Sequence, residues 1–218
     1  MMFYGIKWIF FDMGSTLIDE TDSYRVWFQR ASEAVGGAIS PQEIERGYLD
    51  GMAKYTPTIV GQLKPFGYAE NTTSHLYPSE LDHPYPQAKP LLERLSKDYK
   101  LAVIANQSSG AEARLEGYGI LRYFDFIINS AVVGLHKPDP RIFLLALEKA
   151  GCRPCEAVMI GDRPDNDVYP AKQLGMRTVR IRQGSAACQS PRSAEYEADV
   201  TVDNLEEFGV VFFDADNS

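Results

Sequence analysis

The sequence predicts a doubly wound α/β fold, in which helices cover both faces of a parallel β-sheet. Short apolar runs recur along the chain, as is typical of strands that are buried on both faces. Helical patterns separate most of these runs, and such alternation favours a parallel sheet with right-handed crossovers. The alternation is broken once, between residues 20 and about 86, where only helical patterns occur.

The predicted strands are five apolar runs and one weaker candidate for an edge strand. They are Ile6–Phe11, Leu101–Ala105, Phe124–Ile128, Ala157–Ile160 and Thr178–Ile181, followed by the edge candidate Asp199–Val202. In an open α/β sheet, ligands bind outside the carboxyl ends of the strands. Polar residues that directly follow these runs are therefore the first candidates for a functional site.

Three segments between the predicted strands have helical patterns. Pro90–Leu95 carries leucines at helical spacing. The segment Asp139–Gly151 has an aspartate cap, Pro140 at the first helical position and a terminal glycine. Asp167–Leu174 is a third helical segment, and Gly175 ends it. Together with the strands, these helices predict a Rossmann-like core.

Residues 20–86 are predicted to form an all-helical insertion between the first two core strands. An apolar helical face comprises Tyr24, Trp27, Phe28, Ala31 and Val35. The sequence SPQE, Ser40–Glu43, is a capping box that predicts a second helix through Met52. We therefore expect a core domain of residues 1–19 and 87–218 and a helical domain of residues 20–86.

Composition excludes several classes of partner. The chain has 218 residues, and 22 basic against 30 acidic side chains give a net charge of −8, which disfavours nucleic acid as a partner. No segment approaches the roughly 20 apolar residues of a membrane span, and the amino-terminal residues lack the features of a signal peptide. Three cysteines, Cys152, Cys155 and Cys188, form a sparse and odd set that fits a reducing cytosol. These features predict a cytoplasmic protein, and they do not exclude a phosphorylated small molecule as its partner.

Chemically active residues follow several of the predicted strands. Asp12, Asn106 and the pair Gly161 and Asp162 each come directly after an apolar run. Lys137 lies just before a capped helix. We therefore expect two acids, an amide and a cation on the same rim of the sheet.

These residues resemble the motifs of the haloacid dehalogenase superfamily, in its phosphatase-like branch with a helical cap inserted after the first motif. The matches are Asp12, Thr16 and Leu17 of FFDMGSTL to the motif D-x-D-x-T, Lys137 of HKPDPRIF to the lysine motif, and Gly161, Asp162 and Asp167 of IGDRPDND to the acidic motif. The segment IANQS, at residues 104–108, occupies the place of the family's Ser/Thr motif. Four ordered matches at strand ends are far more specific than one.

The resemblance implies a magnesium-dependent hydrolase that acts through an aspartyl-phosphate intermediate. Asp12 would be the nucleophile that attacks phosphorus. Mg²⁺, which prefers oxygen ligands, would be bound by Asp12, by Asp162 and by the backbone carbonyl of Gly14.

The same resemblance assigns supporting roles. Lys137 would neutralise charge on the nucleophile and on the transferred group, and with Asn106 it would bind the phosphate. Thr16 is expected to brace the first loop, and Asp167 to bond metal-bound water or to brace its own loop.

Two residues depart from the family pattern. Most phosphatases of the family have an aspartate where this chain has Gly14, and that acid supplies general acid–base catalysis, typically worth about 10²–10⁴ in rate. The family's Ser/Thr hydroxyl is replaced by Ala105, which costs one charged hydrogen bond, on the order of 1–3 kcal/mol. Asn106, Gln107 and Ser108 are candidates to replace that hydrogen bond.

These departures leave several alternatives open. The first is a phosphatase that works on good leaving groups or takes its acid from elsewhere, for example from the cap. The second is a catalytically impaired phosphoryl-ligand binder, or pseudo-enzyme. A third is a phosphonatase-type or dehalogenase-type hydrolase, in which Lys54 or Lys64 would be the Schiff-base lysine of a phosphonatase. Retention of Gly161 and Asp162 argues against a dehalogenase, which needs no magnesium.

Substrate specificity is expected to come from the cap. Its candidates are Tyr48, Lys54, Tyr55 and Lys64, which are polar or aromatic residues of residues 20–86. Three histidines, His75, His83 and His136, are interpreted as structural.

Overall fold

The computed structural model describes residues 3–68 and 73–216. Six parallel strands form the central sheet in the order β5-β4-β1-β6-β7-β8. They are β1 Trp8–Phe11, β4 Lys100–Ala105, β5 Phe126–Asn129, β6 Ala157–Gly161, β7 Arg177–Ile181 and β8 Val200–Val202. All six predicted strands are thus confirmed, including the weak edge candidate. The strand order changes direction at β1, and a crevice for ligands forms at such a switch point.

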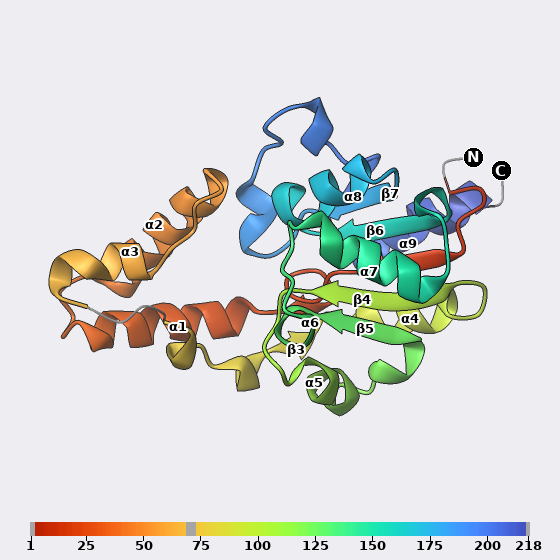
Figure 1. Cartoon of the computed structure of the whole chain (residues 1–218). Helices are drawn as coiled ribbons and strands as arrows, with labels where there is room; N and C mark the ends of the chain where they lie inside the picture. Colours follow the sequence, from red (N-terminus) through yellow and green to blue (C-terminus); the bar gives the residue numbers. More distant parts are fainter. Residues whose placement is uncertain (1–2, 69–72, 217–218) are drawn as a thin grey trace.

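Helices cover both faces of the sheet (Figure 1). On one face lie α4 Ala88–Leu95, α5 Ala111–Gly117 and α9 Leu205–Asp216, and on the other lie α7 Pro140–Ala150 and α8 Tyr169–Gln173. Alternation along β1 explains the two layers, since Ile9 and Phe11 pack into the first layer and Phe10 into the second. All three side chains are fully buried. The doubly wound fold is therefore confirmed.

The two predicted helices on the second face differ in how closely they follow the prediction. α7 begins after Asp139, whose carboxylate accepts a hydrogen bond from the backbone N–H of Arg141 at 2.9 Å, and it ends at Gly151, which has φ 63°. The segment predicted as one helix over Asp167–Leu174 instead begins with a wide π-helical turn, Pro164–Val168, and continues as α8. That turn buries Asp167 completely.

The helical insertion extends from the carboxyl ends of the strands (Figure 1). It contains α1 Thr21–Ala34, α2 Pro41–Ala53, α3 Val60–Leu63 and a small apolar core of its own. The predicted capping box at Ser40 and Glu43 is present at the start of α2. The prediction that the insertion is all-helical is wrong in one detail, because β3 His83–Pro84 pairs antiparallel with β2 Ile18–Asp19. We propose domain boundaries at residues 19/20 and 86/87, beside this pair.

A second contact joins the helical insertion to the core. The side-chain amide of Gln189 donates to the carbonyl of Met52 at 2.9 Å, and the Tyr55 hydroxyl donates to the carbonyl of Ser190 at 2.5 Å. Ala186, from the loop after β7, packs in the apolar core of the insertion. The insertion and the core are thus joined at two places, at the β2–β3 pair and at the loop after β7. Within the described ranges, no helix combines the length and apolar character that a membrane crossing needs.

Candidate active site

Three carboxylates meet at the carboxyl ends of β1 and β6. Asp12 directly follows β1, Asp162 directly follows β6, and Asp167 lies on the π-helical turn. One carboxylate oxygen of each lies within 4.8 Å of the others. The sheet brings together residues that are 150 or more positions apart, because β1 and β6 are neighbours in the sheet.

A single lysine joins two of these acids. The Lys137 ammonium donates to Asp12 Oδ1 at 2.6 Å and to Asp167 Oδ1 at 2.5 Å. Its side chain is only 2% exposed. Burial lowers the pKa of Lys137, but the charges of Asp12 and Asp167 outweigh this effect and leave the pKa above its usual value. The lysine is therefore a fixed cation beside Asp12.

Asp162 has no such partner among residues 3–68 and 73–216. It is 3% exposed, and its buried Oδ1 atom accepts no hydrogen bond from this part of the chain. Burial, and then the negative charges of Asp12 and Asp167, raises the pKa of Asp162 well above its usual value. Burial raises the pKa of Asp167 to about 6 against the lowering effect of the Lys137 charge, and the charge of Asp12 adds to the rise. Buried polar atoms without partners are rare, and each calls for an explanation such as an ion.

A divalent cation would satisfy this cluster. Three ionised aspartates and Lys137 leave a net charge of −3 + 1 = −2, and carboxylate oxygens are the ligands that Mg²⁺ prefers. Both oxygens of Asp167 are already bonded, Oδ1 to Lys137 and Oδ2 to the backbone N–H of Arg163 at 3.1 Å. The unpartnered Oδ1 of Asp162 is the open donor. The residues present thus fit a metal ion.

Glycine at position 161 makes room for this arrangement. A Cβ atom there would lie 2.4 Å from Cγ of Asp167, closer than any real Cβ contact. Asp167 therefore packs into the space that the side chain of Gly161 would fill. The need for space around Asp167 therefore explains why glycine precedes Asp162 in this fold.

The other predicted residues differ in exposure and in hydrogen bonding. The side-chain amide of Asn106 donates to the carbonyl of Lys137 and accepts from its N–H, both at 2.8 Å. Asn106 thereby braces the lysine loop and has one amide hydrogen left, so its binding of phosphate stays a prediction. Ala105 is fully buried at the end of β4. Thr16 is also buried, with its hydroxyl unpartnered and its carbonyl bonded to Gln183 at 2.8 Å; its bracing role stays a prediction.

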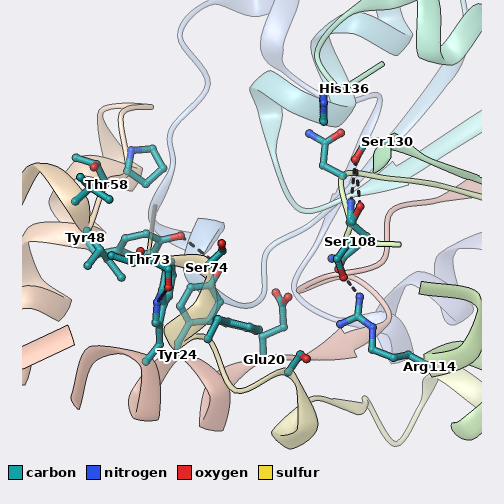
Figure 2. Close-up of a pocket in the computed structure, with 18 residues that line it drawn as sticks. Glu20, Tyr24, Tyr48, Thr58, Thr73, Ser74, Ser108, Arg114, Ser130 and His136 are labelled. Carbon is teal, nitrogen blue, oxygen red and sulfur yellow. Dashed lines mark hydrogen bonds between the residues drawn. The ribbon is translucent and has the colours of Figure 1, made fainter. Parts of the chain in front are cut away.

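The site has two neighbouring spaces that share several lining residues. The inner cavity, of about 220 Å³, is lined by Asp12, Gly14, Lys137, Asp162 and Asp167, among others. The outer pocket, of about 680 Å³, is lined on one side by aromatic residues of the insertion and on the other by polar residues of the core (Figure 2). The aromatic residues are Tyr24, Trp27, Tyr48 and Tyr77, and the polar ones include Gln107, Ser108 and Arg114.

Two charged residues that line the inner cavity were missed by sequence reasoning. Glu20 lines both spaces, and burial followed by the charge of Asp82 raises its pKa to about 7 against the lowering effect of its hydrogen bond from Ser15. Arg163 lines the inner cavity and pairs with Asp165 at 2.7 Å. The available signals were weak: an acid at the start of the insertion, and a cation directly after Asp162.

The specificity candidates separate into two groups. Tyr48 is 7% exposed and lines both spaces. Tyr55 instead bonds to the core at Ser190. Lys54 and Lys64 are exposed, and neither lines the inner cavity or the outer pocket. A Schiff-base lysine from the insertion therefore has no support in the described residues.

Comparisons with known proteins identify the family of the chain. A glyceraldehyde 3-phosphate phosphatase of Methanopyrus kandleri is 35% identical over 57% of this chain, but the match spans only 54% of that protein. A phosphatase of the same name from Methanothermobacter thermautotrophicus is 28% identical over 90% of this chain and 95% of its own length. The crystal structure of a HAD phosphatase from Thermococcus onnurineus, 28% identical, superposes with a TM-score of 0.65 over 95% of this chain and 98% of that one. A family profile described as haloacid dehalogenase-like hydrolase matches residues 9–181. The chain therefore belongs to the haloacid dehalogenase-like hydrolase family.

Proposed function

We propose that this hydrolase is a magnesium-dependent phosphatase of a small phosphorylated metabolite, acting through an aspartyl-phosphate on Asp12. The observation that carries the proposal is the buried cluster in which Lys137 bonds Asp12 and Asp167 while Asp162 Oδ1 has no partner. Relatives named as phosphatases of small phosphate esters support the same substrate class. A cytoplasmic location stays a prediction.

The side chains divide the work of phosphoryl transfer. Asp12 is the nucleophile, since its carboxylate lies in the inner cavity at the end of β1. Lys137 holds that carboxylate in one orientation and supplies positive charge where the phosphoryl oxygens would lie. Asp167 keeps the lysine in place through its own bond to the ammonium.

Mg²⁺ would be held by Asp12, Asp162 and the carbonyl of Gly14, and when bound it would add positive charge against the transferred phosphoryl group. Arg163 adds a further cation at the wall of the inner cavity. The aromatic outer pocket is the space next to this site in which the alcohol part of a phosphate ester would fit.

The test is phosphate release from p-nitrophenyl phosphate and from acetyl phosphate, with and without Mg²⁺ and chelator. Turnover that needs Mg²⁺ and is lost in Asp12→Asn is the expected result. The second candidate, a binder of phosphoryl ligands without turnover, is favoured by Gly14. Magnesium binding by calorimetry without release of phosphate from either compound would support that binder and contradict the phosphatase.

A further inference from the structure

We propose that Glu20 is the general acid and base of this site, in place of the carboxylate that Gly14 lacks. The inference rests on the proposed phosphatase function and assigns the proton carrier of the same reaction. It follows from where the Glu20 carboxylate lies, what holds it there, and which spaces it separates.

The carboxylate of Glu20 occupies the space beside Gly14. A Cβ atom built on Gly14 would lie 2.8 Å from both Oε1 and Oε2 of Glu20 and 3.0 Å from its Cδ. In an aspartate, the carboxylate oxygens lie two bonds beyond Cβ, at about 2.4 Å. The oxygens of Glu20 are thus at nearly the distance from that Cβ at which the oxygens of an aspartate at position 14 would be. The chain delivers a carboxyl group to the same space from a different residue.

The backbone between the two residues turns back on itself. Ser15 adopts a left-handed conformation with φ 53°, and its N–H donates to the carbonyl of Ile18 at 2.9 Å. Gly14 forms an isolated bridge with Ile18, and Glu20 then immediately precedes α1. This reversal returns the side chain of Glu20 toward Gly14.

The turn also fixes the direction of the carboxylate. The Ser15 hydroxyl donates to Oε2 of Glu20 at 3.0 Å. Ser15 is itself 4% exposed and packs against Gly184, where a Cβ atom would lie only 2.4 Å from the Cβ of Ser15. A group that serves in proton transfer must be held within reach of the reacting oxygen, and this packing provides that restraint.

The neighbouring acid of the insertion is already committed to other partners. Asp82 accepts hydrogen bonds from Ser23 at 2.5 Å, from Tyr77 at 3.0 Å and from Arg114 at 3.2 Å. These bonds link the insertion to α5 of the core. Asp82 does not line the inner cavity, whereas Glu20 does.

Glu20 lies at the junction of the two spaces. It lines the inner cavity together with Asp12 and Lys137, and it also lines the outer pocket (Figure 2). Figure 2 shows its carboxylate between the aromatic residue Tyr24 of the insertion and Arg114 of the core. The oxygen that leaves phosphorus lies where the phosphoryl group meets the alcohol, so its proton donor must lie at such a junction.

The proton balance is complete with Glu20 alone. As Asp12 forms a bond to phosphorus and the bond from phosphorus to the leaving oxygen breaks, the protonated Glu20 gives its proton to that oxygen. Water then attacks the phosphorus of the aspartyl-phosphate and gives a proton to Glu20. The bond from phosphorus to Asp12 breaks, inorganic phosphate forms, and Glu20 is protonated again.

The first test is Glu20→Gln, whose amide oxygen still accepts the hydrogen bond from Ser15. We expect kcat to fall by about 10²–10⁴. In single turnovers the rate of phosphoryl transfer should fall far more with an alkyl phosphate such as glycerol 3-phosphate than with p-nitrophenyl phosphate, which needs little protonation. With p-nitrophenyl phosphate, Glu20→Gln should release a burst of nitrophenolate and accumulate a phosphoenzyme that intact mass detects. The reason is that hydrolysis of the aspartyl-phosphate by water also loses its base.

A matched control and a rescue separate chemistry from folding. Glu33→Gln changes an exposed carboxylate of α1, the helix that Glu20 precedes. Glu33 lines neither space, so this variant should leave turnover unchanged. Glu20→Ala empties the space beside Gly14, and Gly14→Asp then places an acid in it. We expect the double variant to recover most of the rate that Glu20→Ala alone loses.

The outcomes distinguish the two levels of the proposal. Wild-type protein without magnesium-dependent turnover refutes the phosphatase function and the role of Glu20 with it. Active wild type with a fully active Glu20→Gln variant refutes the role of Glu20 alone. A loss that is equal for both leaving groups, without a phosphoenzyme and without recovery in the double variant, shows a structural role and also refutes it.

Discussion

Replacing Asp162 by asparagine should change stability in opposite directions with and without magnesium. In the metal-free protein, the buried Oδ1 of Asp162 has no partner, and two further carboxylates lie close to it. A buried polar group without a partner costs about 1–3 kcal/mol, and charge repulsion adds to this cost. Asp162→Asn removes the charge and adds two donors next to Asp12 and Asp167. We therefore expect the free energy of unfolding of the metal-free protein to rise by about 1–3 kcal/mol.

With magnesium bound, the wild type should be the more stable of the two proteins. A ligand present at about 100 times its dissociation constant stabilises the folded state by about 2.7 kcal/mol. The wild type should gain an increment of this order, and Asp162→Asn should gain almost none because it lacks the open carboxylate. Urea unfolding near neutral pH, with chelator and with Mg²⁺, measures both quantities.

The matched control is Asp98→Asn, an exposed acid between α4 and β4. It should leave both free energies of unfolding within about 0.5 kcal/mol of the wild type. If Asp162→Asn is less stable than the wild type without metal, or keeps the full gain with Mg²⁺, the assignment of Asp162 as the open ligand is refuted.

Three further predictions concern the same cluster. Lys137→Met removes the cation that bonds the buried Asp167 and the half-buried Asp12, so it should lower the free energy of unfolding of the metal-free protein by about 3–5 kcal/mol. A loss below about 1 kcal/mol in urea unfolding would contradict this. The stability of the metal-free wild type should fall as pH rises from about 4 to 6. The reason is that Asp167, whose pKa is raised from 3.8 to about 6 in the folded protein, and Asp162 keep their protons to higher pH than in the unfolded chain. A melting temperature that instead rises over this pH range would refute the sign. Gly161→Ala places a Cβ 2.4 Å from Cγ of Asp167, so it should lower the free energy of unfolding by about 1–3 kcal/mol and weaken Mg²⁺ binding in calorimetry. The control Gly117→Ala, where a Cβ meets nothing within 4 Å, should have neither effect.

Local patterns explain why so much of the fold could be predicted. Strands buried on both faces appear as continuous apolar runs, and β4 and β6 differ from the predicted runs by a single residue at one end. The capping box at Ser40 and the cap at Asp139 were predicted because each depends on residues that are two or three positions apart. The π-helical turn before α8 was not predicted, because the packing of Asp167 against Gly161 that accompanies it leaves no periodic pattern in the sequence.

The site was predictable to the extent that strand ends determine it. Asp12 and Asp162 follow neighbouring strands, so the sheet alone brings them to one edge. The bonds between the side chain of Asn106 and the backbone of Lys137 depend on the path of a long loop, which no periodicity describes. Sequence reasoning therefore placed Asn106 correctly at the rim but gave no sign that it braces the lysine loop.

Glu20 shows most clearly where sequence reasoning ends. A motif compares one position with its family counterpart, so at position 14 it records only that a carboxylate is missing. Whether another acid reaches the same space depends on the left-handed turn at Ser15 and on the bridge between Gly14 and Ile18. The chain reverses within a few residues, so the carboxylate of Glu20 lies about 3 Å from the place of a Cβ on Gly14, although the two residues are six positions apart in the sequence. A Cβ at position 14 would lie 2.8 Å from both carboxylate oxygens of Glu20, so a side chain there would have to displace the carboxylate that we propose replaces the missing acid.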